Sequence, residues 1–186
     1  MKRNNLQVLI IVILILSTGF IAQAGSFFKV GESAPNFSLT GLDGRPLSLD
    51  QFKGKVVVLG LFHICEPCLI QSTNLQRVHD ATKDKPVAVI GVNSSGDSLA
   101  DVREFLQGFP LKITYPYLLD PEKKTDKLYG GGKFIPNVYV IDQNGLIRWQ
   151  RVGNFFTDGT LAGHEAILQE VEKLLEAPAP PIRSTM

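Results

Sequence analysis

The sequence is short of cysteine, and it lacks a surplus of charge of either sign. Its 186 residues include only two cysteines, too few for a disulfide-stapled scaffold or for a zinc site made of four cysteines. Lys and Arg number 19 against 18 Asp and Glu, so no basic surface is available to neutralise the phosphates of a nucleic acid. The remaining composition, 44% hydrophobic and 20% charged, is that of an ordinary globular protein. The length suits one domain with its own core.

Long apolar runs are also missing. The apolar stretch at residues 6–21 is interrupted at 17–19 and falls short of the roughly 20 residues that cross a bilayer. It follows two basic residues at 2–3 and precedes a small-x-small cleavage pattern at 22–24. This arrangement predicts a secretory signal peptide over residues 1–24, with an uncleaved membrane anchor as the alternative. In both cases we expect the domain to be exported, to the periplasm or to the outer face of the cytoplasmic membrane.

Three short apolar runs organise the rest of the chain, at residues 56–62, 87–92 and 138–141. Unbroken runs of this length, rich in β-branched residues, are typical of central strands that are covered on both faces. Weaker signals predict hairpin turns at 43–44 and 142–145 and an extra strand at 117–119.

Helical patterns lie between and after these runs. One helix is expected from Pro67 to about Asp84, and two further helical faces are formed by Leu99, Val102, Leu106 and Phe109 and by Leu161, Leu168, Val171 and Leu175. Strands and helices that alternate in this way predict an α/β fold. We expect one domain over residues 28–176, followed by a Pro-rich flexible tail at 177–186.

Both cysteines lie where the first predicted strand meets the first long helix, in the segment His63-Ile64-Cys65-Glu66-Pro67-Cys68. If the helix begins near Glu66, Cys65 lies at its N-terminus, where unpaired N–H groups and the helix dipole favour a thiolate. Cys68 is close enough in sequence for a disulfide with Cys65, and Pro67 stiffens the first turn. A C-x-x-C segment beside a βαβ pattern indicates thioredoxin-like redox chemistry. Half of a metal site, or two buried structural cysteines, is the alternative.

With these residues the sequence resembles the TlpA/ResA-type thiol–disulfide oxidoreductases of the thioredoxin superfamily, in the same broad group as the AhpC/TSA proteins. The resemblance runs from about Val30 to Leu175 and is carried by four segments in order, 31–37, 49–58, 65–68 and 135–142. It implies a thioredoxin-like fold: a central mixed sheet of four or five strands flanked by helices, an N-terminal β-hairpin, and a helix–strand insertion around residues 94–128. It also implies that Pro136 is a cis proline facing the cysteine pair, so that Ile135 and Pro136 form the substrate-binding loop.

Three positions depart from the pattern of that family. Ile64 stands where an aromatic residue usually precedes the first cysteine, and Gln71 stands where a Glu often follows the second cysteine. Leu59 replaces the buried acid of thioredoxins. Because Cys68 and Gln71 share one helix face, Gln71 should lie beside the pair without being able to take a proton. The residues expected to modulate the pair are Glu66, Pro67 and Gln71.

The leading expectation is an exported protein disulfide reductase without a cofactor or a metal ion. Cys65 attacks a disulfide of the partner, Cys68 resolves the mixed disulfide, and water or Glu66 takes the proton of Cys68. The resemblance implies disulfide-bearing envelope proteins as substrates and a membrane thiol reductase as electron donor. Cytochrome c maturation, with apocytochrome c as substrate, and envelope stress defence both fit the family.

Two other functions stay open. A copper-binding module would use His63, Cys65 and Cys68 as ligands. A peroxidase is the second alternative, because the broad family includes peroxidases. The resemblance implies that such a peroxidase has a Thr three residues before its reactive cysteine. This chain has Phe62 at that position, which argues against a peroxidase.

Overall fold

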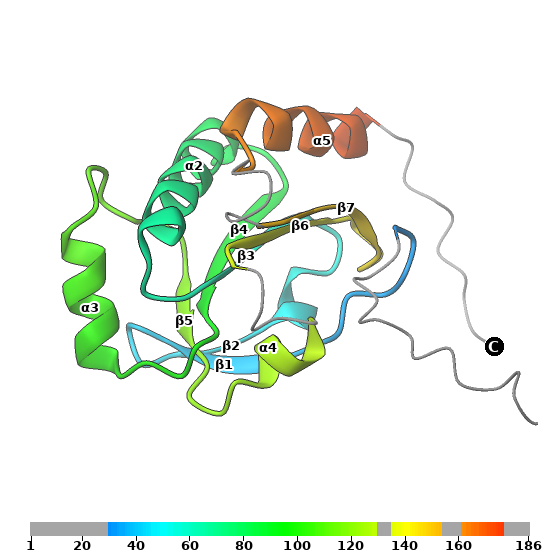
Figure 1. Ribbon diagram of the computed structural model, residues 1–186. Coiled ribbons are helices and arrows are strands. Elements are labelled where there is room, and N and C mark those ends of the chain that lie inside the picture. The colour runs from blue at the N-terminus through cyan, green and yellow to red at the C-terminus, as the bar shows by residue number, and fades with distance from the viewer. Residues whose placement is uncertain (1–29, 130–134, 154–160, 177–186) are drawn as a thin grey trace, which may run out of the picture.

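Strand β3 (Val56–Phe62) forms the centre of the structure, with other strands on both sides of it (Figure 1). The computed structural model describes residues 30–129, 135–153 and 161–176. The elements that precede β3 are β1 (Ser38–Gly41), β2 (Pro46–Ser48) and the 3-10 helix η1 (Leu49–Phe52). Those that follow it are α2 (Glu66–Thr82), β4 (Val87–Asn93), α3 (Leu99–Gln107), β5 (Tyr117–Leu119), α4 (Lys124–Leu128), β6 (Asn137–Ile141), β7 (Ile147–Val152) and α5 (His164–Glu176).

All of these strands belong to one mixed sheet of seven strands in the order β2-β1-β5-β4-β3-β6-β7. Strands β3, β4 and β5 run parallel, whereas β6, β7 and the β1–β2 hairpin pair antiparallel. The mixed sheet with flanking helices confirms the predicted α/β fold, and α3, β5 and α4 form the expected insertion. The strands β5, β4, β3, β6 and β7 match the expected four or five central strands. The expected hairpin belongs to the same sheet, because Thr40 of β1 pairs with Leu119 of β5.

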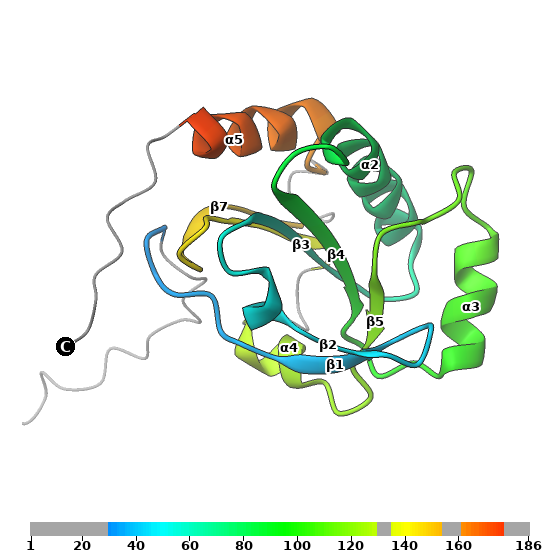
Figure 2. The same cartoon turned by 180° about the vertical axis from the view of Figure 1, so that it is seen from behind.

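The two faces of the sheet carry separate cores. Successive side chains of a strand point to opposite faces. In β3, Phe62 belongs to the core cluster that includes Cys68, whereas Leu59 and Leu61 belong to the cluster that includes Tyr129. Figures 1 and 2 show α2 and α5 on the first of these faces and α4 on the second. Burial on both faces explains why β3 is an unbroken apolar run in the sequence.

Two paired glycines make room for aromatic rings beside the end of β3. Gly60 and Gly91 are partners in the β3–β4 ladder. A Cβ atom on Gly60 would lie 2.6 Å from Phe62 Cε2, and one on Gly91 would lie 2.8 Å from Tyr117 Cδ2. The rings of Phe62 and Tyr117 stack there with their centroids 6.0 Å apart. The bare backbone at the two glycines therefore lets an aromatic layer approach the sheet just below the cysteine segment.

The helix boundaries correct the predicted helical faces. Phe109 lies beyond the end of α3, and Leu161 precedes the start of α5, so neither belongs to the helix assigned to it. The fully buried residues of α5 are Val171, which belongs to the predicted face, and Ile167, which was not predicted. Apolar spacing alone does not show where a helix begins and ends, because capping residues set those points. Helix α2 spans Glu66–Thr82, close to the predicted range.

Some expectations concern residues that the structure does not describe. The predicted signal peptide or anchor at 1–24 and the predicted tail at 177–186 lie outside the described residues. Among the helices that the structure describes, none combines the length and the apolar character needed to cross a membrane.

Candidate redox site

Cys65 is the N-cap residue of α2. Its backbone is extended, with φ −155° and ψ 156°, and its sulfur accepts a hydrogen bond from the backbone N–H of Cys68 at 3.3 Å. Glu66 and Pro67 follow as the first two helical residues, and the missing N–H of Pro67 costs nothing there because first-turn N–H groups have no partner within the helix. The Cys65 sulfur therefore lies at the positive end of the helix dipole, where a negative charge is stabilised.

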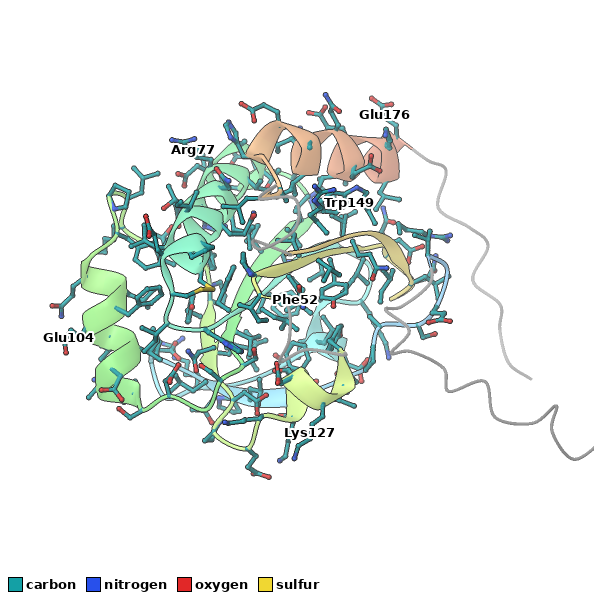
Figure 3. All side chains as sticks on the ribbon, in the orientation of Figure 1. Phe52, Arg77, Glu104, Lys127, Trp149 and Glu176 are labelled. Atoms are coloured by element: carbon teal, nitrogen blue, oxygen red, sulfur yellow. A yellow bond between two sulfur atoms is a disulfide. The ribbon has the colours of Figure 1, made fainter. Side chains whose placement is uncertain are left out.

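Cys65 and Cys68 form a disulfide, with their Cα atoms 5.2 Å apart. Figure 3 shows the yellow sulfur atoms at the start of α2. Cys65 is half-buried, whereas Cys68 has 0% of its surface exposed. The backbone N–H of His63 donates to the Cys68 sulfur at 3.4 Å. This asymmetry leaves Cys65 as the sulfur that a partner can reach, with Cys68 shielded behind it.

The loop around Pro136 lies at the same edge of the sheet. The Ile135–Pro136 peptide bond is cis, which confirms the expectation drawn from the family resemblance. Asn137 pairs with Leu61 in the β3–β6 ladder, so Pro136 lies beside the end of β3, where the cysteine segment begins. The register thus brings Ile135 and Pro136 to the edge that carries the disulfide.

Gly153 holds this loop, and the sequence did not single it out. Its N–H donates to Pro136 O at 2.8 Å and to Asn137 Oδ1 at 3.2 Å. A Cβ atom at this position would lie 2.9 Å from Pro136 N, closer than real contacts allow. A glycine just after a predicted strand was the only sequence signal for this role.

Gln71 is a structural clamp between α2 and the segment that leads into α5. It lies on the buried face of α2 that also carries Cys68, as expected, and only 1% of its surface is exposed. Its Nε2 donates to Ala162 O at 2.9 Å, and its Oε1 accepts from Ala162 N at 2.9 Å. Asn74 Nδ2 donates to the same carbonyl at 3.2 Å. Both ends of the Gln71 amide are therefore engaged with the backbone.

Leu59 and Ile64, the other positions that depart from the family pattern, differ in burial. Leu59 is completely buried in the core on the α4 side of the sheet, so no acid lies there. Ile64 has 42% of its surface exposed, directly before Cys65, and presents an apolar side chain to solvent. Glu66 is exposed at the start of α2.

Charged residues from three segments meet at the end of β3, in a cluster that the sequence analysis did not predict. His63 Nε2 lies 3.8 Å from Asp126 Oδ1 of α4. Asp97 follows β4. Although burial raises its pKa, hydrogen bonds from Ser95 and Asn93 and the nearby charges of His63 and Lys123 bring the pKa of Asp97 below its ordinary value.

Two tyrosines near the cysteine pair are unsuited to proton transfer. Burial raises the pKa of Tyr115 and of Tyr117 well above the ordinary value for a phenol. Both hydroxyl groups therefore stay neutral over the whole physiological range and offer no base to Cys68.

The described residues contain no group of three or more His, Cys, Asp or Glu side chains arranged to hold a metal ion. His63, Cys65 and Cys68 are all described, and in this disulfide form they do not make the copper site considered from the sequence. Phe62 occupies the position at which a Thr was expected for a peroxidase. Its side chain is fully buried and stacked on Tyr117.

Several solved structures described as thiol–disulfide proteins share this fold. One, assigned as the thiol:disulfide interchange protein DsbE from Chlorobium tepidum, has a TM-score of 0.67 and 30% identity, covering 80% of this chain and 99% of that chain. Another is the exposed lipoprotein thioredoxin Etrx1 from Streptococcus pneumoniae strain TIGR4, with a TM-score of 0.59 and 27% identity, covering 75% of this chain and 100% of that chain. The fold and the paired cysteines define the class as a thioredoxin-like thiol–disulfide oxidoreductase.

Sequence comparisons agree with that class. The chain is 32% identical over 161 residues to the thiol-disulfide oxidoreductase ResA of Bacillus thuringiensis (strain Al Hakam), covering 82% of this chain and 91% of that protein. Residues 30–150 match the model of the AhpC/TSA family. The chain belongs to the AhpC/TSA family and is an enzyme of the thiol–disulfide oxidoreductase type.

Proposed function

We propose that the chain is an exported protein disulfide reductase that acts through Cys65-Glu66-Pro67-Cys68. The observation that supports this most directly is the position of the Cys65 sulfur at the N-cap of α2, bonded to a fully buried Cys68. An N-terminal helix position favours the thiolate, which is the nucleophile of disulfide exchange. The substrate-binding loop in this proposal is Ile135-Pro136, at the same edge of the sheet.

Reduction of a partner disulfide takes place in two exchanges. In the first, the Cys65 thiolate attacks one sulfur of the partner, a Cys65–partner disulfide forms, and the other partner sulfur leaves as a thiolate and takes up a proton. In the second, Cys68 gives up its proton, its sulfur attacks Cys65 Sγ, and the second partner sulfur leaves. The partner gains two electrons, and the enzyme ends with the Cys65–Cys68 disulfide. A membrane thiol reductase returns the two electrons.

A protein is a better fit than a small molecule as the substrate. The described residues enclose a cavity of about 480 Å³ between the β1–β2 hairpin, α3 and residues 113–118, and neither cysteine lines it. The cysteine pair instead lies beside exposed apolar surface at Ile64. Disulfide-bearing envelope proteins, apocytochrome c among them, are the proposed substrates.

Covalent trapping tests the roles of the two cysteines and the class of partner together. With Cys68→Ser, the mixed disulfide to Cys65 cannot be resolved, so partner proteins should accumulate as complexes that a reductant releases. Cys65→Ser is the matched control and should trap nothing. Partners attached through Cys68 in the Cys65→Ser variant would reverse the assigned roles, and peroxide consumption that depends on Cys65 without any trapped protein would point to a peroxidase.

The reductive direction is tested by the reduction potential. We expect the Cys65–Cys68 couple to be reducing, well below the roughly −120 mV of a dedicated oxidant. Equilibration of the purified protein with a series of dithiothreitol ratios measures this potential. A value near that of the dedicated oxidants would contradict the reductase proposal while leaving the exchange chemistry intact.

Export is supported by the pattern of residues 1–24 and by the description of the pneumococcal relative as an exposed lipoprotein. Fractionation of cells that express the full chain should place it in the periplasm or on the outer face of the cytoplasmic membrane. Sequencing of the mature N-terminus then distinguishes cleavage after residue 24 from an intact anchor. Recovery of the protein in the cytoplasm with its N-terminus intact would contradict this part of the proposal.

A further inference from the structure

We propose that His63, supported by Asp126, is a positioning residue for the thiol–disulfide reaction that stabilises the thiolate of the cysteine pair in its imidazolium form. This proposal rests on the proposed function, which it deepens by naming the residue that gives the site its pH dependence. His63 makes and breaks no bond in the exchange, and its contribution is electrostatic.

The geometry of the two side chains is the first observation. His63 Nε2 and Asp126 Oδ1 are 3.8 Å apart, and each is shielded from solvent and lacks a hydrogen-bond partner among the described residues. The side chains as a whole are 30% and 18% exposed. Buried polar atoms without partners are rare, because each keeps the cost of losing its water without a replacement hydrogen bond. A protonated His63 facing an ionised Asp126 turns this unfavourable arrangement into an attractive one.

Asp126 is held in place by the way α4 begins. The carboxylate of Asp120, which is itself 1% exposed, accepts hydrogen bonds from Lys124 N at 2.9 Å and from both Thr125 N and Thr125 Oγ1 at 2.6 Å. Thr125 is fully buried directly before Asp126. Figure 3 shows Lys127, the next residue, pointing outward from α4. The start of α4 is thus fixed to the end of β5, with the Asp126 carboxylate on its inner side next to His63.

The backbone of His63 also contacts the sulfur of Cys68. Its N–H donates to Cys68 Sγ at 3.4 Å, and His63 precedes Cys65 by only two residues. A nearby positive charge favours the ionised form of a thiol, and a nearby carboxylate favours the ionised form of an imidazole. Asp126 therefore stabilises the imidazolium form of His63, and that form stabilises a thiolate at the cysteine pair.

Other charged groups lie near His63 and also affect its charge. Asp97, from the loop after β4, interacts with the charges of both His63 and Lys123. Lys123 precedes α4, and Glu66 is exposed in the first turn of α2. Asp97 acts on His63 in the same direction as Asp126. Lys123 opposes both carboxylates, and the exposed Glu66 is screened by water.

The test is the rate at which the reduced full chain is alkylated by iodoacetamide as a function of pH. The His63→Gln variant should shift the midpoint of the profile upward by about one pH unit, because an opposite charge near a thiol typically changes its pKa by about this much. At a pH below the midpoint, the rate should then fall about tenfold. The His63→Arg variant keeps a permanent positive charge and should keep the midpoint at or below that of the wild type.

His79→Gln is the matched control. His79 lies on α2 eleven residues after Cys68, about 16 Å away along the helix, so its loss should leave the profile unchanged. An equal effect of His63→Gln and His79→Gln would overturn the proposal. Equal upward shifts in His63→Gln and His63→Arg would also overturn it, since a structural defect and not the charge would then be responsible.

A second measurement needs no variant at the cysteine site. Coupling between two groups is reciprocal, so a thiolate must stabilise the imidazolium form as much as the imidazolium stabilises the thiolate. The NMR titration of the His63 ring protons, one of only three histidine signals, should therefore move to higher pH on reduction of the disulfide. In Asp126→Asn the same titration should move to lower pH in the oxidised protein. An unchanged titration in both experiments would contradict the proposal.

These measurements are independent of the proposed function. Iodoacetamide is a small electrophile and the NMR titration needs no partner, so both report on His63 even in a protein that reduces nothing. Failure to trap or reduce any protein would contradict the reductase function alone. A protein that reduces its partners normally, but whose alkylation profile does not change in His63→Gln, would contradict this inference alone.

Discussion

Replacing Gln71 with glutamate should place a buried acid at the contact with Ala162, and the ionised form of that acid should destabilise the fold. In the native protein the amide donates to Ala162 O and accepts from Ala162 N, each at 2.9 Å. A protonated glutamic acid reproduces both hydrogen bonds, because its O–H can donate and its C=O can accept. An ionised carboxylate keeps only the bond from Ala162 N and places a negative oxygen against a carbonyl oxygen in a site that is 1% exposed.

The magnitude follows from these two effects. Burial raises the pKa of a carboxyl group by up to 3–5 units, and the N–H of Ala162 offsets part of that rise, so we expect a shift of about 2 units in the Gln71→Glu variant. The folded-state pKa of the introduced carboxyl group is then about 6.3, above the value of about 4.3 in the unfolded chain. Below about pH 4.3 both states are protonated, and the variant retains its stability. As the pH rises through about 6.3, the folded state binds more protons than the unfolded state, and about 2.7 kcal/mol of stability is lost in all.

Thermal unfolding of the oxidised protein at pH 4 and at pH 8 measures this effect. For a domain of this size, a loss of about 2.7 kcal/mol lowers the melting temperature by roughly 5–10 °C at pH 8, with little change at pH 4. Gln107→Glu, the same substitution at an exposed position of α3, is the control and should show no such difference. An equal loss at both pH values, or none at either, would show that the amide of Gln71 does not clamp Ala162. The carboxylate at position 71 should also slow alkylation of Cys68 above the same pH, since the two residues share the buried face of α2.

Three further outcomes follow from the contacts around the site. Alkylation of the reduced protein at mildly acidic pH should label the half-buried Cys65 before the fully buried Cys68, as mass spectrometry of the peptides would show. Gly153→Ala should cost about 1–3 kcal/mol in urea unfolding, because its Cβ would crowd the Pro136 loop, whereas Gly108→Ala has ordinary contacts and should be close to neutral. Asp120→Asn should destabilise the protein by about 1–3 kcal/mol, since the new amide turns donors toward N–H groups at the start of α4, and unchanged hydrogen exchange in α4 would contradict this.

The strands could be read from the sequence because their signal is local. Residues 56–62 are an unbroken apolar run, and β3 is Val56–Phe62 because both of its faces are buried. The weak signal at 117–119 also matches β5 residue for residue. The pairing of β1 with β5 was not predictable, because a strand pattern shows which residues are extended but not which distant strand they join.

The contacts that define the site were less accessible, because they join positions far apart in the chain. Gln71 could be placed on the face of Cys68 from helical spacing, but its partner Ala162 is 91 residues away. The approach of Asp126 to His63 likewise depends on where α4 is anchored. The cis bond at Pro136 came from the family resemblance alone, since a cis X–Pro bond is a minority state that no residue pattern specifies.

The capping role of Cys65 links the melting behaviour of the protein to its electron affinity. In the oxidised form a neutral disulfide sulfur caps the N–H of Cys68, whereas in the reduced form a thiolate would do so as a charged and stronger acceptor. The loop that the disulfide closes is very short, so it restrains the unfolded chain little. A thermodynamic cycle then equates the stability difference between the two redox forms with the difference in reduction potential between the folded and the unfolded cysteine pair. About 1.4 kcal/mol corresponds to 30 mV. Two denaturation curves, one with and one without the disulfide, therefore measure how much folding changes the reduction potential of the cysteine pair.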